Sequence, residues 1–360
     1  MKVLYDNIVF DGQRIGGISR YFSILAAELP AQGVDVSMGL LATKNVYMHD
    51  ACPLRRLSFM RKYNEAYSRW LMRHSHYDVY HPTYYFTRML EYKHPQVPTV
   101  VTVHDLIQER FSGKNAEEEA ALEQVRLEKA RIVDAADRII AISENTKRDM
   151  MEIWGTDERK IDVIHHGLMW NENLLSTPAK LPFSAPYLLF VGDRKAEYKN
   201  FKEFIVAASQ VVGKYGLHIV CTGRPFSSEE VDFLKRYGVD GLTHSFFVDE
   251  GTLLWLYENA VCFVFPSRYE GFGLPILEAF KADCPIILAN ASCFPEIGGD
   301  AVDYYEPGSP DSLVEKLTLL LDDASHRDSL RRAGRERLSQ FGIEKMVEAT
   351  KECYCRALGK

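Results

Sequence analysis

Apolar and polar positions along the chain follow a repeating order of strand and helix. Near the start, "KVLYDNIVF" (residues 2–10) has the β-branched and aromatic content of a strand, and the glycines that follow precede a helical pattern that continues to residue 33. A buried strand is predicted over 98–106, a charged helix over 116–136 and another strand over 137–143. A unit of strand, loop and helix therefore recurs through the first part of the chain.

The periodicity breaks once, over residues 171–186, where three prolines occur without an apolar pattern. The alternation then resumes in "YLLFVGD", "LHIVCTG", "CFVFPS" and "PIILAN". It predicts an α/β fold of two Rossmann-like, doubly wound domains, each with a parallel sheet covered by helices. We expect the first domain over 1–175, the second over 176–340, and a last helix over 341–360 that packs back on the first domain. Ligands should bind at the carboxyl ends of the strands, in a cleft between the domains.

Composition supports a folded protein of this size. The chain has 360 residues, more than a single core usually covers, and 46% of them are hydrophobic against 26% charged. The first ten residues lack the features of an export signal, and no apolar run approaches a membrane span, so we expect a cytoplasmic protein. Seven cysteines without a C-x-x-C motif predict reduced thiols rather than a disulfide framework or a zinc site.

The charge distribution contains one local exception. A formal net charge of −7 argues against nucleic-acid binding, because phosphate contacts need a basic face. The segment from Arg55 to His74, however, carries six Arg and Lys residues against the single acid Glu65, with large apolar residues between them. This mixture either binds an anionic surface at the inner face of the membrane through Arg55 to Arg73, or forms a solvated helix with ordinary packing contacts. Both interpretations stay open at this point.

The stretch "FPSRYEGFGLPILEAF" combines a glycine-rich turn with two glutamates, Glu270 and Glu278, eight residues apart. A buried strand precedes the turn, and a helix follows it with Pro275 at its first position. Gly271 and Gly273 let backbone amides approach a ligand closely, and the helix end adds partial positive charge, which together suit phosphate. The turn can therefore hold an anion without a basic side chain.

The two carboxylates should flank this anion rather than repel it. Glu278 is expected in the first helical turn and Glu270 before the turn, so each can accept hydrogen bonds from hydroxyl groups on its own side. A nucleotide sugar has hydroxyls on both sides of a diphosphate and fits this pattern. The alternative is an ordinary strand-to-helix turn with a surface acid and an acid that complements the helix dipole.

The segment "PSRYEGFGLPILEA" closely resembles the E-x7-E signature of the retaining GT-B glycosyltransferases of family 4, also called group 1. The resemblance continues in "VGDRKAEYKNF", "CTGRP" and "CPIILANASCFPEIGGDAVDYYEP", and near the front in "GGISRYF", "VTVHDL" and "VIHHG". It covers most of the chain, is strongest from Tyr187 to Pro307, and is weakest from Leu40 to Met72, where acceptor-binding parts of such enzymes vary. It implies a GT-B fold with an acceptor-binding first domain and a nucleotide-sugar-binding second domain.

The resemblance also implies roles for individual residues. Glu270 would contact the donor hexose and Glu278 the ribose, and four donor-binding backbone amides would bind the diphosphate, those of Gly271, Phe272, Gly273 and Leu274. Arg194 and Lys199 would clamp the diphosphate oxygens and stabilise the charge that builds on the leaving phosphate. No metal would then be required, and the chain contains no D-x-D motif.

The arginine departs from the family pattern, because many relatives have it directly after the glycine, whereas here Asp193 follows Gly192 and Arg194 comes next. His104, at the end of an apolar strand, would face the donor sugar near the reacting carbon and complete a catalytic set with Glu270, Lys199 and Arg194.

The first domain also contains a pair of adjacent glycines near its start and a pair of adjacent histidines near its end. Gly16 and Gly17 would bring the backbone close to the diphosphate or the acceptor, or else they form only a tight turn between strand and helix. His165 and His166 are interpreted as part of a structural turn at the end of the domain.

Three functional hypotheses follow. The first is a metal-independent retaining glycosyltransferase that moves a hexose, mannose-like, from a nucleoside diphosphate sugar of GDP or UDP type to a growing surface glycan that is lipid-linked, as in bacterial lipopolysaccharide or capsule mannosyltransferases. It needs no cofactor besides the donor substrate. The second is a nicotinamide-dependent oxidoreductase, which the missing G-x-G-x-x-G disfavours. The third is a non-catalytic nucleotide-sugar binder, which the complete E-x7-E with Lys199 and His104 disfavours.

Overall fold

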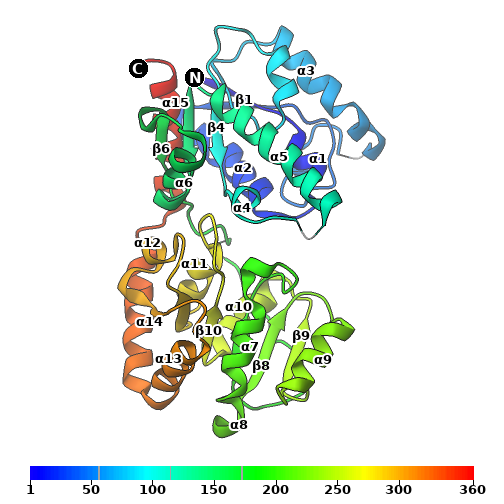
Figure 1. Cartoon of the computed structure of the whole chain (residues 1–360). Helices are drawn as coiled ribbons and strands as arrows, with labels where there is room; N and C mark the ends of the chain where they lie inside the picture. The colour runs from blue at the N-terminus through cyan, green and yellow to red at the C-terminus, as the bar shows by residue number, and fades with distance from the viewer. Residues whose placement is uncertain (56, 114, 172) are drawn as a thin grey trace. The chain divides into compact units, whose positions relative to one another are not determined.

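The computed structural model of the protein describes residues 1–55, 57–113, 115–171 and 173–360. The chain divides into two compact units (Figure 1). Unit 1 comprises Met1–Met169 and Ile343–Lys360, and unit 2 comprises Trp170–Gly342. The first unit thus ends at residue 169, whereas the sequence pattern placed the boundary at 175, and both chain ends belong to unit 1.

Unit 1 is built on parallel strands. Its strands are β1 (Lys2–Tyr5), β2 (Asp35–Met38), β3 (Val79–Tyr80), β4 (Val100–Val103), β5 (Arg138–Ala141) and β6 (Ile161–Val163). They pair in the orders β2-β1-β3 and β4-β5-β6, and a parallel bridge between Tyr80 and Thr99 connects the two sets. The direction in which strands are added reverses between the neighbours β1 and β3. The chain continues from β1 to β2 on one side of this pair, and from β3 to β4 on the other side.

The helices of unit 1 connect and flank these strands. They are α1 (Ile8–Gly12), α2 (Gly17–Glu28), α3 (Asn64–His74), α4 (Ile107–Arg110), α5 (Ala116–Asp134), α6 (Glu144–Trp154) and α15 (Ile343–Ala357). Short 3-10 helices are η1 (Leu29–Gln32), η2 (His49–Ala51), η3 (Ser58–Tyr63), η4 (Thr87–Tyr92) and η5 (Glu158–Lys160). The last helix, α15, packs against β5, α2 and η1. Inside unit 1 the Tyr354 hydroxyl is bonded to the Tyr5 hydroxyl at 2.9 Å and to Nδ1 of His81 at 2.8 Å, which fastens this helix to the sheet.

Unit 2 contains a single six-stranded parallel sheet. Its strands are β7 (Tyr187–Phe190), β8 (His218–Thr222), β9 (Thr243–Phe246), β10 (Cys262–Phe265), β11 (Ile286–Ala289) and β12 (Asp303–Tyr305). The order is β12-β11-β10-β7-β8-β9, and β7, β10 and β11 are completely buried. The direction of strand addition reverses between β7 and β10, and such a switch point is where doubly wound sheets bind ligands.

The helices of unit 2 cover this sheet (Figure 1). They are α7 (Phe201–Ser209), α8 (Val212–Tyr215), α9 (Ser228–Arg236), α10 (Glu250–Asn259), α11 (Leu274–Lys281), α12 (Phe294–Gly298), α13 (Pro310–Asp322) and α14 (Ala324–Leu338). The 3-10 helices are η6 (Glu197–Lys199) and η7 (Gly299–Ala301). Among them, α7 packs against α13 and α11 against α14.

The first predicted strand is too long. It was expected over 2–10, but β1 ends at Tyr5 and the chain enters α1 at Ile8. The cause is Asp6, whose buried carboxylate accepts hydrogen bonds from the Ile8 amide at 3.0 Å and from the Thr83 hydroxyl. An aspartate that bonds the amide two residues ahead forms a turn and takes the backbone out of the sheet.

All seven cysteines are free thiols, and six of them are buried. Within the described ranges, no helix has the length and apolar content that crossing a bilayer requires.

Candidate functional site

The switch point of unit 2 brings an ion pair to the carboxyl edge of the sheet. The chain leaving β7 reaches η6, which ends at Lys199, and the chain leaving β10 passes through Glu270. Nζ of Lys199 lies 2.6 Å from Oε1 of Glu270, and their side chains are only 16% and 12% exposed. Two of the predicted catalytic residues, 71 positions apart in the sequence, are therefore in direct contact.

Backbone contacts hold this pair in place. The Arg268 amide donates to the Tyr198 carbonyl at 2.7 Å, which joins the two loops beside the ion pair. Gly192 has φ +149°, a backbone conformation that favours glycine, whereas a Cβ built there would make only ordinary contact, 3.6 Å, with Cδ of Lys199. The Ser292 hydroxyl donates to the Glu270 carbonyl at 2.7 Å. The pair is thus ordered before any ligand arrives.

The glycine-rich turn leads directly into α11. Gly271, Phe272 and Gly273 are buried, and Gly273 has φ +89°, in the left-handed region that favours glycine. A Cβ at this position would approach Ile276 to 3.1 Å and Phe294 to 3.2 Å, so a larger residue would also be crowded. The amides of this turn and of Leu274 lie at the positive end of α11, which suits an anionic ligand.

Glu278 lies deeper in the helix than expected. Because α11 begins at Leu274, the glutamate falls in the second turn and the first turn contains no acid. Its Oε2 accepts a hydrogen bond from the Tyr257 hydroxyl at 3.3 Å. Burial, and then the Glu278 charge, raise the pKa of Tyr257 well above its ordinary value, so this tyrosine stays protonated and keeps donating.

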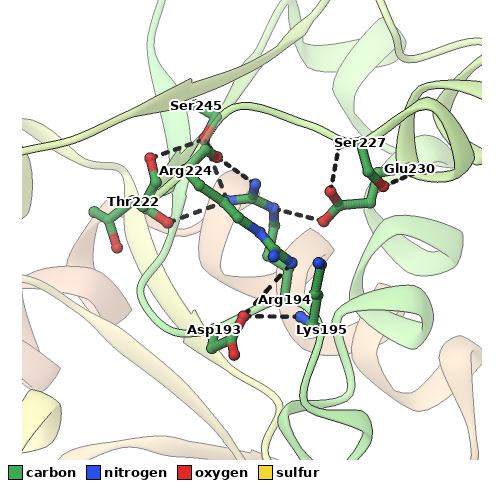
Figure 2. A network of polar contacts seen from close by, with 9 residues as sticks. Asp193, Arg194, Lys195, Thr222, Arg224, Ser227, Glu230 and Ser245 are labelled. Atoms are coloured by element: carbon green, nitrogen blue, oxygen red, sulfur yellow. Dashed lines mark hydrogen bonds and ion pairs between the residues drawn. The ribbon is translucent and has the colours of Figure 1, made fainter.

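Arg194 occupies a different environment from the one predicted. Figure 2 shows its guanidinium bonded to Glu230, and the hydrogen bonds run from Nε to Glu230 at 2.9 Å, from Nη1 to the Thr222 carbonyl at 3.1 Å and from Nη2 to the Arg224 carbonyl at 2.5 Å. The side chain is 1% exposed. A phosphate-clamp role does not fit this geometry, because the guanidinium is buried and its donors are already used inside unit 2.

The partner of Arg194 is ionised in this setting. Burial works against the charge of Glu230, but hydrogen bonds from the Ser227 amide and the Arg194 guanidinium outweigh it and hold the pKa of Glu230 below its usual value. Ser227 and Glu230 also form a capping box at the start of α9. The arginine therefore ties β7, β8 and α9 together.

Arg224 is a cationic residue that the sequence analysis did not single out. It follows β8, next to β7 in the sheet, and its guanidinium lies 3.7 Å from the exposed carboxylate of Asp193. Nε and Nη2 of Arg224 are buried without a hydrogen-bond partner among the described residues. The only sequence signal was its position in "CTGRP", directly after the glycine that ends a strand.

In unit 1, His104 directly follows β4 at the carboxyl edge of the strands. Its backbone amide donates to the Tyr85 hydroxyl at 3.1 Å, while Nε2 is buried and has no hydrogen-bond partner among the described residues. Burial, reinforced by His81 and by the Lys129 ammonium, lowers the pKa of His104 to about 3. The ring is thus neutral near pH 7.

His166 was interpreted as structural, but it packs on the predicted catalytic histidine. Its ring stacks on that of His104 with centroids 5.8 Å apart and an interplanar angle of 16°. Both strands before these histidines, β4 and β6, flank β5, so their carboxyl ends share one edge of the sheet. The strand order, which sequence spacing does not reveal, brings the two rings together.

Gly16 and Gly17 form the beginning of α2 rather than a strained turn. Gly16 is the N-cap residue in extended conformation, with φ −177°. A Cβ there would approach Oε1 of Gln13 to 2.3 Å, so a larger residue would displace the flexible Gln13 side chain. That oxygen accepts the Ser19 amide at 3.2 Å, so a side-chain acceptor already serves this helix end.

No group of three or more His, Cys, Asp or Glu side chains is placed to hold a metal ion in the ranges that the structure describes.

Two family models match the chain. The model "Glycosyl transferases group 1" matches residues 177–337, which contain Lys199, Glu270 and Glu278. The model "Glycosyltransferase Family 4" matches residues 15–168, which contain His104. Together they cover most of both units.

Curated relatives and solved structures agree with this assignment. O-antigen chain mannosyltransferase B from Escherichia coli is 36% identical over 108 residues, which is 30% of this chain and 28% of that relative. An uncharacterised glycosyltransferase from Methanocaldococcus jannaschii is 25% identical over 299 residues, 77% of this chain and 75% of the relative.

Among solved structures, sucrose-phosphate synthase from Thermosynechococcus elongatus aligns with a TM-score of 0.74 at 19% identity, covering 99% of this chain and 98% of that one. An Anabaena protein, HepE, solved with UDP and glucose, aligns with a TM-score of 0.67 at 16% identity and covers 98% of each chain. The fold is GT-B, with two Rossmann-like domains. The chain is therefore a glycosyltransferase and belongs to the group 1 glycosyltransferases.

Proposed function

We propose that the protein is a metal-independent, retaining hexosyltransferase that moves a mannose-like hexose from a nucleoside diphosphate sugar of GDP or UDP type to a growing surface glycan. The observation that carries the proposal is the ordered ion pair between Lys199 and Glu270 at the switch point of unit 2, next to the glycine-rich turn. This arrangement supplies a cation for a leaving phosphate and a carboxylate for sugar hydroxyls within one short distance.

The donor would be held by unit 2 in three parts. The amides of Gly271 to Leu274, at the positive end of α11, suit the diphosphate. Glu278, already accepting from Tyr257, has further acceptor capacity for the two ribose hydroxyls. Glu270 keeps Lys199 oriented and can accept a hydroxyl of the hexose. Arg224, rather than Arg194, is the second cation at this edge.

The reaction would be a front-face displacement. The bond between the anomeric carbon and the phosphate oxygen breaks, a bond from that carbon to the acceptor oxygen forms on the same side, and the acceptor proton passes to the leaving phosphate oxygen. Negative charge builds on the phosphate as it leaves, and the Lys199 ammonium stabilises it more than it stabilises the intact donor. In this scheme Glu270 orients the sugar and does not attack it.

His104 would serve the transfer in its neutral form. With a pKa lowered to about 3 by burial, the ring adds no positive charge near pH 7 and its buried Nε2 can exchange a hydrogen bond with a sugar hydroxyl. His166, stacked on it at 5.8 Å, limits the orientations that the ring can adopt.

One comparison supports the choice of hexose and acceptor, and a second supports a nucleotide-linked sugar as the donor. The mannosyltransferase relative, which acts on an O-antigen chain by its name, shares 36% identity over the aligned 108 residues. The Anabaena structure with UDP and glucose shows that a protein of this fold holds a nucleotide and a sugar. For this chain, mannose, the surface glycan and the nucleotide remain proposals.

A lipid-linked acceptor would require the enzyme to work at a membrane surface, and the segment 55–74 supplies suitable groups. Leu57, Phe59, Tyr63 and Trp70 are 44%, 60%, 46% and 54% exposed. Arg55, Lys62 and Arg73 are exposed as well, whereas Arg56, which belongs to the predicted basic segment, lies outside the described residues. Basic residues beside exposed aromatic ones bind anionic bilayers.

Two arginines of the segment 55–74 already have partners within the protein. Arg69 is paired with Glu65, and the guanidiniums of Arg69 and Arg73 each lie 4.7 Å from the ring centre of Tyr92. The exposed aromatics are therefore the sharper probe. Replacing Phe59 and Trp70 with serine should reduce sedimentation with anionic vesicles while donor hydrolysis is retained, and equal sedimentation of variant and parent would rule the membrane surface out.

The function is tested by incubating the purified chain with GDP-, UDP-, ADP- and dTDP-linked hexoses and a polyprenyl-diphosphate-linked saccharide. We expect release of one nucleoside diphosphate to rise when the saccharide is added, to persist in EDTA, and to yield a product with the anomeric configuration of the donor by NMR. Inversion at the anomeric carbon, or loss of turnover in EDTA, would refute the retaining or the metal-independent part. Tight donor binding without any turnover would favour the non-catalytic binder.

A further inference from the structure

We infer that a cavity in unit 1, which contains none of the residues assigned to the donor or to catalysis, is a subsite for a neutral hexose unit of the acceptor glycan. This inference rests on the proposed function, because it names the site that would hold the second substrate. The cavity measures about 450 Å³, within the range of small-molecule sites of roughly 300–1,000 Å³. Its walls are formed by Asn7, Ile8, Asp11, Arg61, Lys62, Glu65 and Phe86.

The position of the cavity follows from the strand order of unit 1. The order reverses between β1 and β3, which are neighbours in the sheet. Asn7 and Ile8 follow the carboxyl end of β1, and Phe86 lies in the chain that leaves β3. Arg61, from η3, and Glu65, from α3, complete the walls. Doubly wound sheets bind ligands at this kind of switch point, so the cavity lies where the topology of unit 1 favours a ligand.

One wall contains an acceptor that the protein leaves unused. Asn7 is 2% exposed, and its Nδ2 donates to Oδ2 of Asp11 at 2.7 Å, which sets the orientation of the amide. Its Oδ1 is buried and has no hydrogen-bond partner among the described residues. An unsatisfied buried acceptor costs about 1–3 kcal/mol, and a ligand hydroxyl that donated to it would remove this cost.

Asp11 is held as a second, oriented acceptor. Asn64, completely buried, donates from Nδ2 to Oδ1 of Asp11 at 2.9 Å, while Asn7 bonds the other carboxylate oxygen. The Oδ1 of Asn64 accepts the Leu41 amide at 2.9 Å, so this asparagine is fixed by the backbone. Each oxygen of Asp11 has a further lone pair, which suits a pair of neighbouring hydroxyls.

The charged residues that line the cavity have a net charge of zero, which favours an uncharged ligand. Among the lining residues, the carboxylates of Asp11 and Glu65 stand against the cations of Arg61 and Lys62, and Glu65 is also paired with Arg69 outside the wall. An anionic or a cationic ligand would meet no excess of opposite charge. Phe86 and Ile8 add an aromatic and an aliphatic surface. A neutral sugar has both an apolar C–H face and a rim of hydroxyls, and so matches this lining better than a phosphate or a peptide.

Saturation-transfer NMR with the full chain, without donor, tests the subsite directly. The probes are methyl α-mannoside, methyl α-glucoside and methyl α-galactoside at millimolar concentration, with methyl glucuronide and glucosamine as charged counterparts. We expect saturation of at least one neutral glycoside and weaker signals from the charged sugars. No glycoside signal, or stronger signals from a charged sugar, would overturn the inference.

Two variants locate the signal. Phe86→Leu keeps an apolar side chain but removes the aromatic surface, and Asp11→Asn removes the carboxylate; each should raise the dissociation constant of the bound glycoside about tenfold or more. Glu91→Gln, an exposed carboxylate of the same unit that does not line the cavity, is the matched control and should change nothing. Because Asp11→Asn can disturb its two asparagine neighbours, Phe86→Leu is the decisive variant, and an unchanged signal in it would refute the location.

The transfer assay separates this inference from the proposed function. In Phe86→Leu the KM for acceptor should rise about tenfold, while donor hydrolysis in the absence of acceptor keeps its kcat and KM. If the parent protein released no nucleoside diphosphate from any donor, the proposed function would fail, and glycoside binding would still decide the subsite by itself. If donor hydrolysis fell together with acceptor use, the cavity would belong to the donor site and the inference would be wrong.

Discussion

The two units share one architecture and use it for opposite electrostatic tasks. Each has parallel strands with a reversal in strand order, and each places candidate site residues after the carboxyl ends of its strands. In unit 2 the loops after the strands hold two ion pairs, one between Lys199 and Glu270 and one between Arg194 and Glu230. In unit 1 the corresponding edge holds the neutral, buried rings of His104 and His166.

The difference teaches what each unit can bind. Fixed, half-buried cations are useful where a ligand gains negative charge, as a departing nucleoside diphosphate does. Neutral hydrogen-bonding groups and a charge-balanced cavity are useful where the ligand is an uncharged sugar. The same fold thus offers a charged edge and a neutral edge, and each can be disturbed separately.

The largest effect is expected at the charged edge. Lys199→Ala should lower turnover about a thousandfold or more, roughly 4 kcal/mol of transition-state stabilisation, because the variant loses the ammonium paired with Glu270, and Arg224 and the α11 amides do not replace it at that position. Initial rates with saturating donor measure it. Lys195→Ala, an exposed lysine four positions earlier, is the control and should turn over like the parent. Comparable rates in the two variants would mean that the ion pair of unit 2 has no catalytic part.

Mild acid should weaken unit 1 before unit 2. Burial lowers the pKa of His81, His104 and His166, so the unfolded chain binds their protons near pH 6.5 while the folded unit does not. The contribution of these neutral histidines to the free energy of unfolding is complete above about pH 6.5. Below that pH it is lost by about 1.4 kcal/mol per pH unit for each histidine. Between about pH 7.5 and 5.5 unit 1 should lose as much as about 4 kcal/mol.

Urea unfolding followed by pulsed proteolysis, with peptides of each unit identified by mass spectrometry, measures this difference. Unit 2 provides the comparison: burial also lowers the pKa of His244 there, but this ring is only partly buried, and the lowered pKa of Glu230 affects stability only in more acidic solution, so the loss in unit 2 should be smaller. His104→Gln should make the unfolding midpoint of unit 1 less sensitive to pH. Equal losses in the two units over this range would contradict the comparison.

Arg194→Met should destabilise unit 2 by about 3 kcal/mol, because it leaves the carboxylate of Glu230 without its cation. Urea titration of unit 2 peptides checks the loss. The double variant Arg194→Met with Glu230→Gln should recover part of it, since glutamine removes the uncompensated charge and keeps the capping box of α9. A stable Arg194→Met protein with strongly reduced turnover would instead restore the phosphate-clamp role that the sequence suggested.

The smallest effect concerns Glu278. Glu278→Ala should raise the dissociation constant of the nucleoside diphosphate about tenfold, near 1.4 kcal/mol, with little change in kcat, because a ribose contact is equally strong before and during the reaction. Isothermal titration with GDP and UDP measures it. A large fall in kcat at unchanged affinity would place this glutamate in the reaction rather than at the ribose.

Sequence reasoning was sound where local spacing decides the geometry. The alternation of strands and helices predicted the α/β class, and the turn between β10 and α11 follows from its glycines and proline. It was less accurate at the end of β1, where Asp6 forms a turn with the Ile8 amide and is also held by the Thr83 hydroxyl from 77 positions away. It also placed Glu278 one turn too early, because the helix begins only at Leu274.

By itself, the amino-acid sequence determined the repeated strand and helix units, the family signature and the two carboxylates around the glycine-rich turn, because these depend on residues close together in the chain. Only the tertiary structure decided which ion pairs form: buried Arg194 pairs with Glu230, and Lys199 pairs with Glu270. It also decided that His166 stacks on His104 and that a charge-balanced cavity lies beside Asn7. The physical reason is that burial and pairing are set by strand order, which joins segments that the sequence keeps far apart.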